Sequence, residues 1–398
     1  MGWLVTVTVA AVDAALVARV RGRLAADADA PTAARVAALV REEAGVRGAA
    51  QVLAAVETLR SELLGAGPLE ALLHEPGVTD VLVNGPREVW VDRGRGLERA
   101  DAHFTDDREI RRLAVRLAAA AGRRLDDAVP CADIRLADGV RLHAVLPPVS
   151  PGGAYLSFRV PRQRAFSLDE LIELGAMPLA AARLLLDVIA SRASFVVTGG
   201  TGTGKTTLLS TLLGCVNPRE RIVLVEDSGE LRPDHPHVVR LEARSPNIEG
   251  VGAIELGSLV RHALRMRPDR LVVGEVRGSE CVDLLAALNV GHDGGAGTLH
   301  ANSVADVPAR IEALCTAAGL SRDAAHSQLA AGVHIVVHLA RRAGGRRVLD
   351  SIGVVVRRGD GLVEVQPAMR LRGADWVDDV GRIALDRVLE RRSASGEA

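Results

Sequence analysis

The sequence predicts an α/β protein in which a largely parallel sheet, covered by helices, fills the second half of the chain. From about residue 178 onward, short apolar runs typical of strands alternate with longer runs that have helical apolar spacing, a pattern that favours parallel strands joined by helices. Acidic residues follow two of these strands, and a glycine-rich segment follows the first. We expect strands at 195–198, 222–225, 238–241, 271–273, 297–300 and 335–339, and helices at about 178–192, 205–214, 256–265, 279–289, 304–317 and 321–332.

The composition is that of a soluble globular protein of two or three domains. The chain has 398 residues, of which 48% are hydrophobic and 25% charged, and its net charge is −1. A neutral balance gives no bulk electrostatic reason to bind nucleic acid, and an aromatic content of 2% leaves few rings on which bases could stack. No C-x-x-C pair occurs, so we expect reduced, structural thiols at Cys131, Cys215, Cys281 and Cys315.

The N-terminus predicts neither a signal peptide nor a membrane span. Its apolar opening, from Trp3 to Val12, has no basic leader and is followed closely by Asp13 and Arg19. It is shorter than the roughly 18 apolar residues that a spanning helix needs. We expect a cytoplasmic protein, which partners would hold at the inner face of the plasma membrane if it works there.

Breaks in composition divide the chain into four segments. A helical leader is interrupted at Ala30-Pro31-Thr32 and ends in the linker-like Gly65-Ala66-Gly67-Pro68. Capping boxes open helices at Asp106 and at Ser167. We expect the leader over 1–65, a small α+β domain over 66–165, the helix-covered sheet over 166–345 and a C-terminal extension over 346–398.

The most informative segment is Gly199-Gly200-Thr201-Gly202-Thr203-Gly204-Lys205-Thr206-Thr207. Of the 49 basic residues, Lys205 is the only lysine, and a guanidinium is a poor substitute for a compact ammonium at a tight phosphate site. The spacing fits G-x-x-x-x-G-K-T between a strand and a helix, which is the context of a phosphate-binding loop. Its amides would face phosphate oxygens, Lys205 would reach the β- and γ-phosphates, and Thr206 would ligate Mg²⁺.

Two later strands end in acidic residues. The first is followed by Glu226-Asp227-Ser228-Gly229-Glu230, whose carboxylates could support Mg²⁺ or orient an attacking water, although a solvated loop can have the same composition. The second ends in Gly274-Glu275, where Glu275 could polarise water or support Mg²⁺ through a water ligand. A strand often ends in an acid, and it is the preceding phosphate loop that favours this interpretation.

Two histidines, His292 and His300, flank a glycine-rich run. Three interpretations compete: a metal pair, sensors of the γ-phosphate, or loop histidines that bond locally. No nearby cysteine or H-x-x-x-H spacing supports a metal, and the motif alone does not decide.

Most of the arginines must be solvated surface charge. In a hairpin centred on Asp138-Gly139, pairing around a two-residue loop puts Arg135 on one face and Arg141 with His143 on the other, so we expect Arg141 to contact a nucleotide. Five further arginines lie among the motifs and are candidates for nucleotide contacts, with surface ion pairs as the alternative: Arg240, Arg244, Arg265, Arg267 and Arg277.

In this order the motifs resemble those of the type II/IV secretion ATPase superfamily, most closely its Tad/Flp pilus-assembly and conjugal-transfer-associated branch, of the actinobacterial type. The similarity covers about residues 60–340. The four-cysteine zinc subdomain of some type II secretion members is absent, which weighs against that branch. The most specific pieces are Gly67-Pro68-Leu69-Glu70, Thr79-Asp80-Val81-Leu82-Val83-Asn84-Gly85, Leu264-Arg265-Met266-Arg267-Pro268-Asp269-Arg270, and Gly291-His292-Asp293-Gly294 through His300-Ala301-Asn302-Ser303.

The resemblance implies a RecA-like P-loop NTPase domain, preceded by a small α+β N-terminal domain and the short helical leader. It implies that Glu226 to Glu230, including Asp227, form the aspartate box, with Glu230 as the catalytic glutamate. It also implies that Glu275 lies in the Walker B segment and that His292 and His300 belong to the histidine box. Members of this superfamily typically form hexameric rings, with arginines completing a nucleotide pocket between the two domains.

We therefore expect an ATP- and Mg²⁺-dependent motor. Its ring would work on an inner-membrane platform protein, to assemble a pilus or to secrete a substrate, without direct contact to nucleic acid. Two alternatives stay open: a conjugation-associated DNA-transfer ATPase, and a nucleotide-gated scaffold with negligible turnover.

Overall fold

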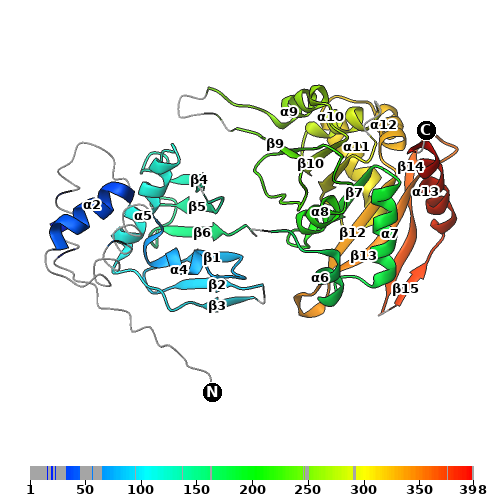
Figure 1. Cartoon of the computed structure of the whole chain (residues 1–398). Helices are drawn as coiled ribbons and strands as arrows, with labels where there is room; N and C mark the ends of the chain where they lie inside the picture. Colours follow the sequence, from blue (N-terminus) through cyan, green and yellow to red (C-terminus); the bar gives the residue numbers. More distant parts are fainter. Residues whose placement is uncertain are drawn as a thin grey trace, which may run out of the picture. The chain divides into compact units, whose positions relative to one another are not determined.

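The chain divides into two compact units, Met1–Pro161 and Arg162–Ala398, each considered by itself (Figure 1). Of the leader expected over 1–65, the structure describes chiefly helix α2 (Ala33–Ala44), which follows the expected break at residues 30–32. This computed structural model describes residues 16, 19, 20, 23, 33–44, 56, 65–94, 96–136, 138–161, 164–244, 246, 251–289, 293–373 and 375–396.

The first unit is built on an antiparallel sheet with the strand order β3-β2-β1-β6-β5-β4. Buried and more exposed residues alternate along its central strands, because successive side chains of a strand point to opposite faces. Helix α5 begins after its N-cap Asp106, whose side chain accepts a hydrogen bond from the amide of Glu109, and packs its apolar stripe into the same core. The elements are η1 (Gly67–Leu69), α4 (Glu70–Leu73), β1 (Asp80–Val83), β2 (Val89–Asp92), β3 (Leu97–Arg99), α5 (Asp107–Ala120), β4 (Cys131–Arg135), β5 (Arg141–Val145) and β6 (Tyr155–Arg159).

The hairpin of β4 and β5 has a different register from the expected one. Arg135 pairs directly with Arg141, and Asp133 with His143, so the two arginines lie on the same face of the sheet. The amide of Leu136 bonds to the carbonyl oxygen of Val140, which closes a three-residue loop instead of a two-residue one. One extra loop residue moves every side chain of the returning strand to the opposite face, which is why the expected separation of the arginines was wrong.

The second unit is a mixed sheet with the order β15-β14-β13-β12-β7-β11-β10-β8-β9. The strands from β12 to β9 are parallel, and β13 to β15 are antiparallel to their neighbours. The strands and helices that the sequence predicted here are confirmed. The strands are β7 (Phe195–Gly199), β8 (Ile222–Glu226), β9 (Val238–Glu242), β10 (Arg270–Val276), β11 (Ala296–Leu299), β12 (Ile335–Arg341), β13 (Arg347–Arg357), β14 (Val363–Arg372) and β15 (Asp375–Asp378).

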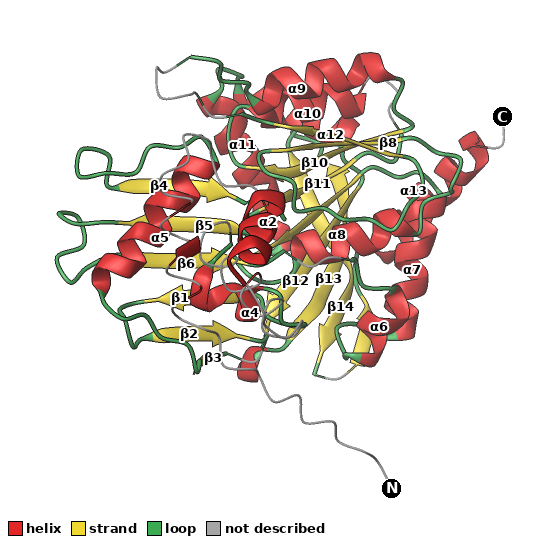
Figure 2. Ribbon diagram, turned by 60° about the vertical axis from the view of Figure 1, so that its left-hand side comes forward, coloured by secondary structure: helices red, strands yellow, loops and turns green. Residues whose placement is uncertain are grey.

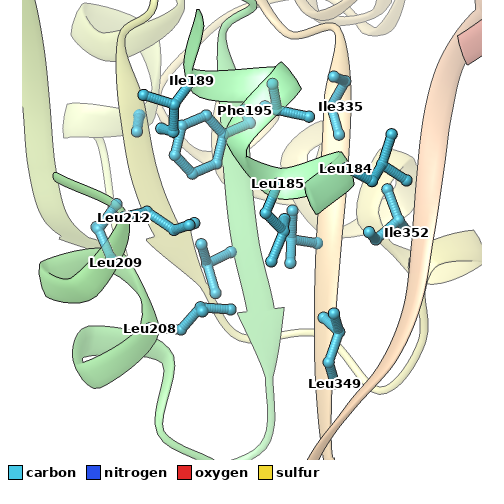
Figure 3. Packing of buried hydrophobic residues seen from close by; sticks show 14 of the residues in the cluster. Leu184, Leu185, Ile189, Phe195, Leu208, Leu209, Leu212, Ile335, Leu349 and Ile352 are labelled. Atoms are coloured by element: carbon cyan, nitrogen blue, oxygen red, sulfur yellow. The ribbon is translucent and has the colours of Figure 1, made fainter. Parts of the chain in front are cut away.

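Helices cover both faces of this sheet (Figure 2), because its central strands are apolar on both sides. Phe195 and Val197 of β7 pack with α7 and α8, whereas Val196 between them packs with the helices of the other face. Figure 3 shows Phe195 among the side chains of α7 and α8. The helices are α6 (Leu168–Glu173), α7 (Leu179–Ala190), α8 (Lys205–Gly214), α9 (Leu256–Ala263), η2 (Leu264–Met266), α10 (Glu280–Asn289), η3 (Val304–Asp306), α11 (Val307–Ala317), α12 (Arg322–Gly332), η4 (Ala343–Gly345) and α13 (Arg382–Gly396).

Residues 346–398, expected as a separate extension, continue the sheet of the second unit. β13 pairs with β12 along its length, and α13 contributes Leu385 to the core that α7 and α8 share. The expected boundary after residue 345 thus falls inside a hairpin. The sequence did not indicate this continuity because β13 returns antiparallel, outside the alternation of strand and helix that marks the parallel part.

Two further predictions concerned membrane-spanning helices and the state of the four cysteines. Within the described ranges, no helix combines the length and the apolar composition needed to cross a bilayer. All four cysteines are free thiols. Cys281 and Cys315 are buried, and the thiol of Cys315 donates to the sulfur of Cys281 at 3.7 Å, whereas Cys131 and Cys215 are exposed.

Candidate nucleotide site at the phosphate loop

The phosphate loop joins the central strand β7 to helix α8. Gly199, Gly202 and Gly204 have φ angles of 147°, 70° and 96°, a range that residues with a side chain rarely adopt. A Cβ on Gly199 would lie 2.4 Å from the carbonyl oxygen of Leu339 in β12. Gly204 is the N-cap of α8, so the unpaired amides of the helix N-terminus point into the loop.

Lys205, the first residue of α8, is buried inside this loop. Its Nζ donates hydrogen bonds to the carbonyl oxygens of Gly199 and Gly200, at 3.1 and 3.0 Å. The same atom lies 3.4 Å from Nε2 of His300. Burial lowers the pKa of Lys205, because a desolvated ammonium is less stable than a hydrated one. The amine therefore lies against the backbone of the loop that would receive a phosphate.

Glu275 and His300 meet beside this amine. Glu275 is near the end of β10, and its Oε1 accepts a hydrogen bond from Nε2 of His300 at 2.6 Å, while its carboxylate also pairs with Arg277. Burial and then the nearby Lys205 cation lower the pKa of His300. The ring is therefore neutral at neutral pH, with its proton on the nitrogen that faces Glu275. The sequence motif alone did not decide among three roles for His300, and these contacts favour a position that faces the phosphates.

The two glutamates of the acidic loop after β8 have different surroundings. Glu226 is buried, and its Oε1 accepts hydrogen bonds from the amides of Glu230 and Leu231, at 2.8 and 2.9 Å. Burial raises the pKa of Glu226. Glu230 turns toward α8, where the hydroxyl of Thr206 donates to its Oε2 at 3.5 Å. Glu226 thus holds the backbone that presents Glu230, and its expected contact with a nucleotide stays a prediction.

Gly274 makes room for this arrangement. A Cβ on Gly274 would lie 2.7 Å from Cγ of Glu226, closer than two carbon atoms can approach without displacement. The carbonyl oxygen of Gly274 accepts a hydrogen bond from the hydroxyl of Thr298 at 2.7 Å, which ties β10 to β11. The glycine before Glu275 therefore lets the acidic loop pack against the strand that carries Glu275.

Sequence reasoning missed His338, which is buried on β12 next to the phosphate loop. Its Nδ1 lies 2.9 Å from the hydroxyl of Thr198, the residue before Gly199. Burial lowers the pKa of His338. A single histidine in an apolar strand carries no signal by itself, because its contact depends on the pairing of His338 with Thr198 across β12 and β7.

The side chains around Lys205 fit a nucleotide with magnesium. Mg²⁺ prefers oxygen ligands and takes several of them from phosphates and water. The hydroxyl of Thr206 and the carboxylates of Glu230 and Glu275 supply protein oxygens at the mouth of the loop. In the part of the chain that the structure describes, no group of three or more His, Cys, Asp or Glu side chains could hold a metal by itself.

Comparison with known proteins identifies the family. The family described as type II/IV secretion system protein matches residues 62–360. The chain belongs to this family. A protein of Mycobacterium tuberculosis whose name assigns it to conjugal transfer is 56% identical over 323 residues, which cover 80% of this chain and 92% of that protein. The type IV secretion system protein PtlH of Bordetella pertussis is 34% identical over 312 residues, which cover 71% and 92%.

This type II/IV secretion protein has the architecture that its sequence predicted, a RecA-like P-loop domain preceded by a small α+β domain. Among solved structures, the VirB11 ATPase of the Brucella suis type IV secretion system, in complex with sulphate, is similar. It is 25% identical with a TM-score of 0.39, covering 72% of this chain and 94% of that one.

The arginines that the sequence suggested as nucleotide contacts lie in different parts of the fold. Arg277 is in the site, through its pair with Glu275. Arg240 is exposed on β9, four strands from β7 in the sheet, which is roughly 19 Å at the usual strand spacing. Arg244 donates to the carbonyl oxygen of Gly252 at 2.7 Å.

The remaining candidates are also spread over the fold. Arg265 lies 3.3 Å from Nδ1 of His262, and Arg267 is exposed in a left-handed conformation after η2. Arg141 belongs to the first unit. Nucleotide contacts by Arg141, Arg240, Arg244 and Arg267 stay predictions.

The segment with the predicted histidine box includes strand β11. His292 lies outside the described residues. Its neighbour Asp293 precedes β11 and pairs with Arg392 of α13, whereas His300 follows β11 and reaches the phosphate loop. Since β11 runs parallel to β7, Asp293 and His300 lie at opposite edges of the sheet. Of the two histidines, His300 is the one that the structure brings to Lys205.

Proposed function

We propose that this chain hydrolyses ATP at the phosphate loop. The observation that carries the proposal is the set of contacts that joins Lys205 to His300 and His300 to Glu275, with Glu230 beside Thr206. Lys205 and Thr206 come from α8, Glu275 from β10, and Glu230 and His300 from the segments after β8 and β11, and all meet at the N-terminus of α8. Membership of a family of ATPases supports the same conclusion.

In the proposed reaction, a water attacks the γ-phosphorus of ATP and the bond to the β,γ-bridging oxygen breaks. Glu230 takes the proton of that water, because its carboxylate is turned toward the loop whereas that of Glu226 is bonded to backbone amides. Lys205 moves from the carbonyl oxygens to the phosphates and stabilises their charge. His300 donates to a γ-phosphate oxygen when it exchanges its bond to Glu275 for the nucleotide.

Thr206 would hold Mg²⁺ directly and Glu275 would hold it through a water ligand. When bound, Mg²⁺ supplies charge neutralisation between the β- and γ-phosphates.

We further propose that the chain assembles into a hexameric ring that does work on an inner-membrane platform protein, from the cytoplasmic side. The Tad/Flp pilus is the load that the sequence motifs favour. The family and the type IV secretion name of the PtlH relative support a motor of this general kind. Native mass measurement with and without ATP tests the ring, and a purely monomeric species under both conditions would contradict it.

The decisive experiment measures phosphate release by the wild type and three variants. Lys205→Ala should abolish turnover while its circular dichroism and melting temperature stay unchanged, because the lost interaction is local to the phosphates. Glu230→Gln should bind ATP but not hydrolyse it. Glu226→Gln is the matched control, since its amide oxygen can still accept from the two backbone amides.

Full ATP turnover in Lys205→Ala would contradict the proposal that the phosphate loop hydrolyses ATP. If Glu230→Gln turns over normally while Glu226→Gln is inactive, the proton acceptor is Glu226.

A second candidate function is the transfer of DNA during conjugation. The name of the 56% identical relative from Mycobacterium tuberculosis favours it. In that case, DNA should stimulate ATP hydrolysis, and the stimulation should fall steeply with salt because phosphate contacts release counterions. Turnover that is unaffected by DNA at low salt would remove this candidate.

A further inference from the structure

The hairpin between β12 and β13 lies beside the phosphate loop. Leu339 of β12 pairs with Gly199 of β7 in parallel register, so the hairpin leaves the sheet at the edge where the loop begins. Figure 1 shows β12 next to β7, and β13 follows β12 in the sheet. The hairpin carries four arginines: Arg341, Arg342, Arg346 and Arg347.

Two of these arginines bind to the hairpin itself. Arg342 pairs with Asp350, and Nε of Arg341 donates to the carbonyl oxygen of Gly345 at 3.3 Å. Among the described residues, neither Arg346 nor Arg347 forms an ion pair with a carboxylate.

Arg347 differs from Arg346 in its contact with the phosphate loop. Its Cδ lies 3.8 Å from the position that a Cβ on Gly204 would occupy, and Cβ of Thr207 in α8 lies 4.0 Å from the same position. The guanidinium begins at Nε, one bond beyond Cδ, and Arg347 is an exposed residue. A cation that forms no ion pair with the described carboxylates thus lies beside the first turn of the helix that would receive the phosphates.

The order of strands indicates which end of a nucleotide Arg347 would meet. Glu230, Glu275 and His300 follow or end β8, β10 and β11, which all lie on one side of β7. The hairpin with Arg347 lies on the other side of β7. If the γ-phosphate of a nucleotide faces His300 and Glu275, its nucleoside can extend away from them on the side of β7 where β12 and β13 lie.

We propose that Arg347 is a nucleotide-binding residue whose guanidinium stacks on the base of bound ATP. A guanidinium is planar and weakly hydrated, so it stacks on aromatic faces, whereas an ammonium has no plane to stack. Every base offers such a face, and stacking of a base on a side chain is sequence-tolerant and favourable. The proposal rests on the proposed function, because it takes the γ-phosphate to lie at His300 and Glu275.

Calorimetric titration with two probes tests it on the full chain. ADP has a base, and inorganic tripolyphosphate has phosphates alone. In Arg347→Ala, the Kd for ADP should rise about tenfold or more, which is about 1.4 kcal/mol, while the Kd for tripolyphosphate stays within about twofold. Arg347→Lys should resemble Arg347→Ala, since charge without a plane does not restore stacking. Arg346→Ala, the neighbouring exposed arginine, should leave both values unchanged.

An unchanged Kd for ADP in Arg347→Ala overturns the proposal. A rise that is equal for ADP and tripolyphosphate also overturns it, because the contact would then be with phosphate. If Arg347→Ala does not fold, Arg347→Lys carries the same two outcomes. Since binding is measured apart from turnover, a wild type that binds ADP but releases no phosphate would contradict the proposed hydrolysis and not the role of Arg347.

Discussion

At Gly274, a missing side chain determines where two carboxylates can lie. The residue gives Glu226 the space to pack against β10, and Glu226 in turn holds the amides of Glu230 and Leu231. The sequence indicated the acidic residues, because charged side chains after apolar strands are conspicuous. It did not indicate that Glu226 would turn inward, since that depends on a contact between β8 and β10.

Gly274→Ala tests this coupling. The added Cβ overlaps Cγ of Glu226, so the free energy of unfolding should fall by about 1–3 kcal/mol, as for other overpacked cores. kcat for ATP should fall more than KM rises, because the loop with Glu230 shifts. Gly359→Ala is the control, since a Cβ there has no neighbour within 4 Å. Chemical denaturation measures the free energy of unfolding, and phosphate release measures kcat and KM. A Gly274→Ala variant with an unchanged free energy of unfolding would contradict the tight contact.

Helix α13 contacts residues far from its own position in the sequence. Arg392 pairs with Asp293 before β11 and donates to Nε2 of His334, before β12, at 2.8 Å. The sequence predicted the helices and strands of the second unit because their apolar periodicity is local. The sequence did not predict the β4–β5 register, because one additional loop residue does not change the apolar periodicity of the strands. It did not predict the docking of α13, because a long-range ion pair has no periodic signal in the sequence.

The pKa of His334 measures how firmly α13 is docked. Burial, and then the Arg392 cation, lower this pKa from 6.5 to about 4. The fold thus favours the neutral form of His334. As the pH falls from 6.5 toward 4, the free energy of unfolding should fall by about 3 kcal/mol in total, because the unfolded chain takes up this proton before the folded chain does. Histidine NMR titration should give a midpoint near 4, which Arg392→Gln raises and Arg387→Gln, on an exposed position of α13, leaves alone. A wild-type midpoint near 6.5 would show that the site is open to water.

At the scale of the whole molecule, strands β7 to β15 form one continuous sheet in the second unit. Its core takes residues from the last fifty positions, including Leu349, Ile352 and Leu385. The sequence predicted a boundary after residue 345, but residues on both sides of it share one sheet and one hydrophobic core. The motifs end before the apolar residues that complete this core.

Two truncated chains test this unity. Residues 162–398 form a compact unit and should fold and bind ADP alone. Residues 162–345 lack β13, which leaves the β12 edge unpaired and the faces of several core side chains exposed. That chain should aggregate or bind hydrophobic dyes. A cooperative melting transition in residues 162–345 would show that the C-terminal strands are dispensable.

The phosphate loop also contains the one side-chain amine of the sequence, since Lys205 is the only lysine. Burial lowers its pKa, which increases the fraction of reactive free amine. Acylating reagents can therefore label lysine in this protein at one position only, and a nucleotide in the loop would shield it. The mass of a single peptide then reports occupancy of the site, in a purified protein or in a cell extract, with no introduced tag or mutation.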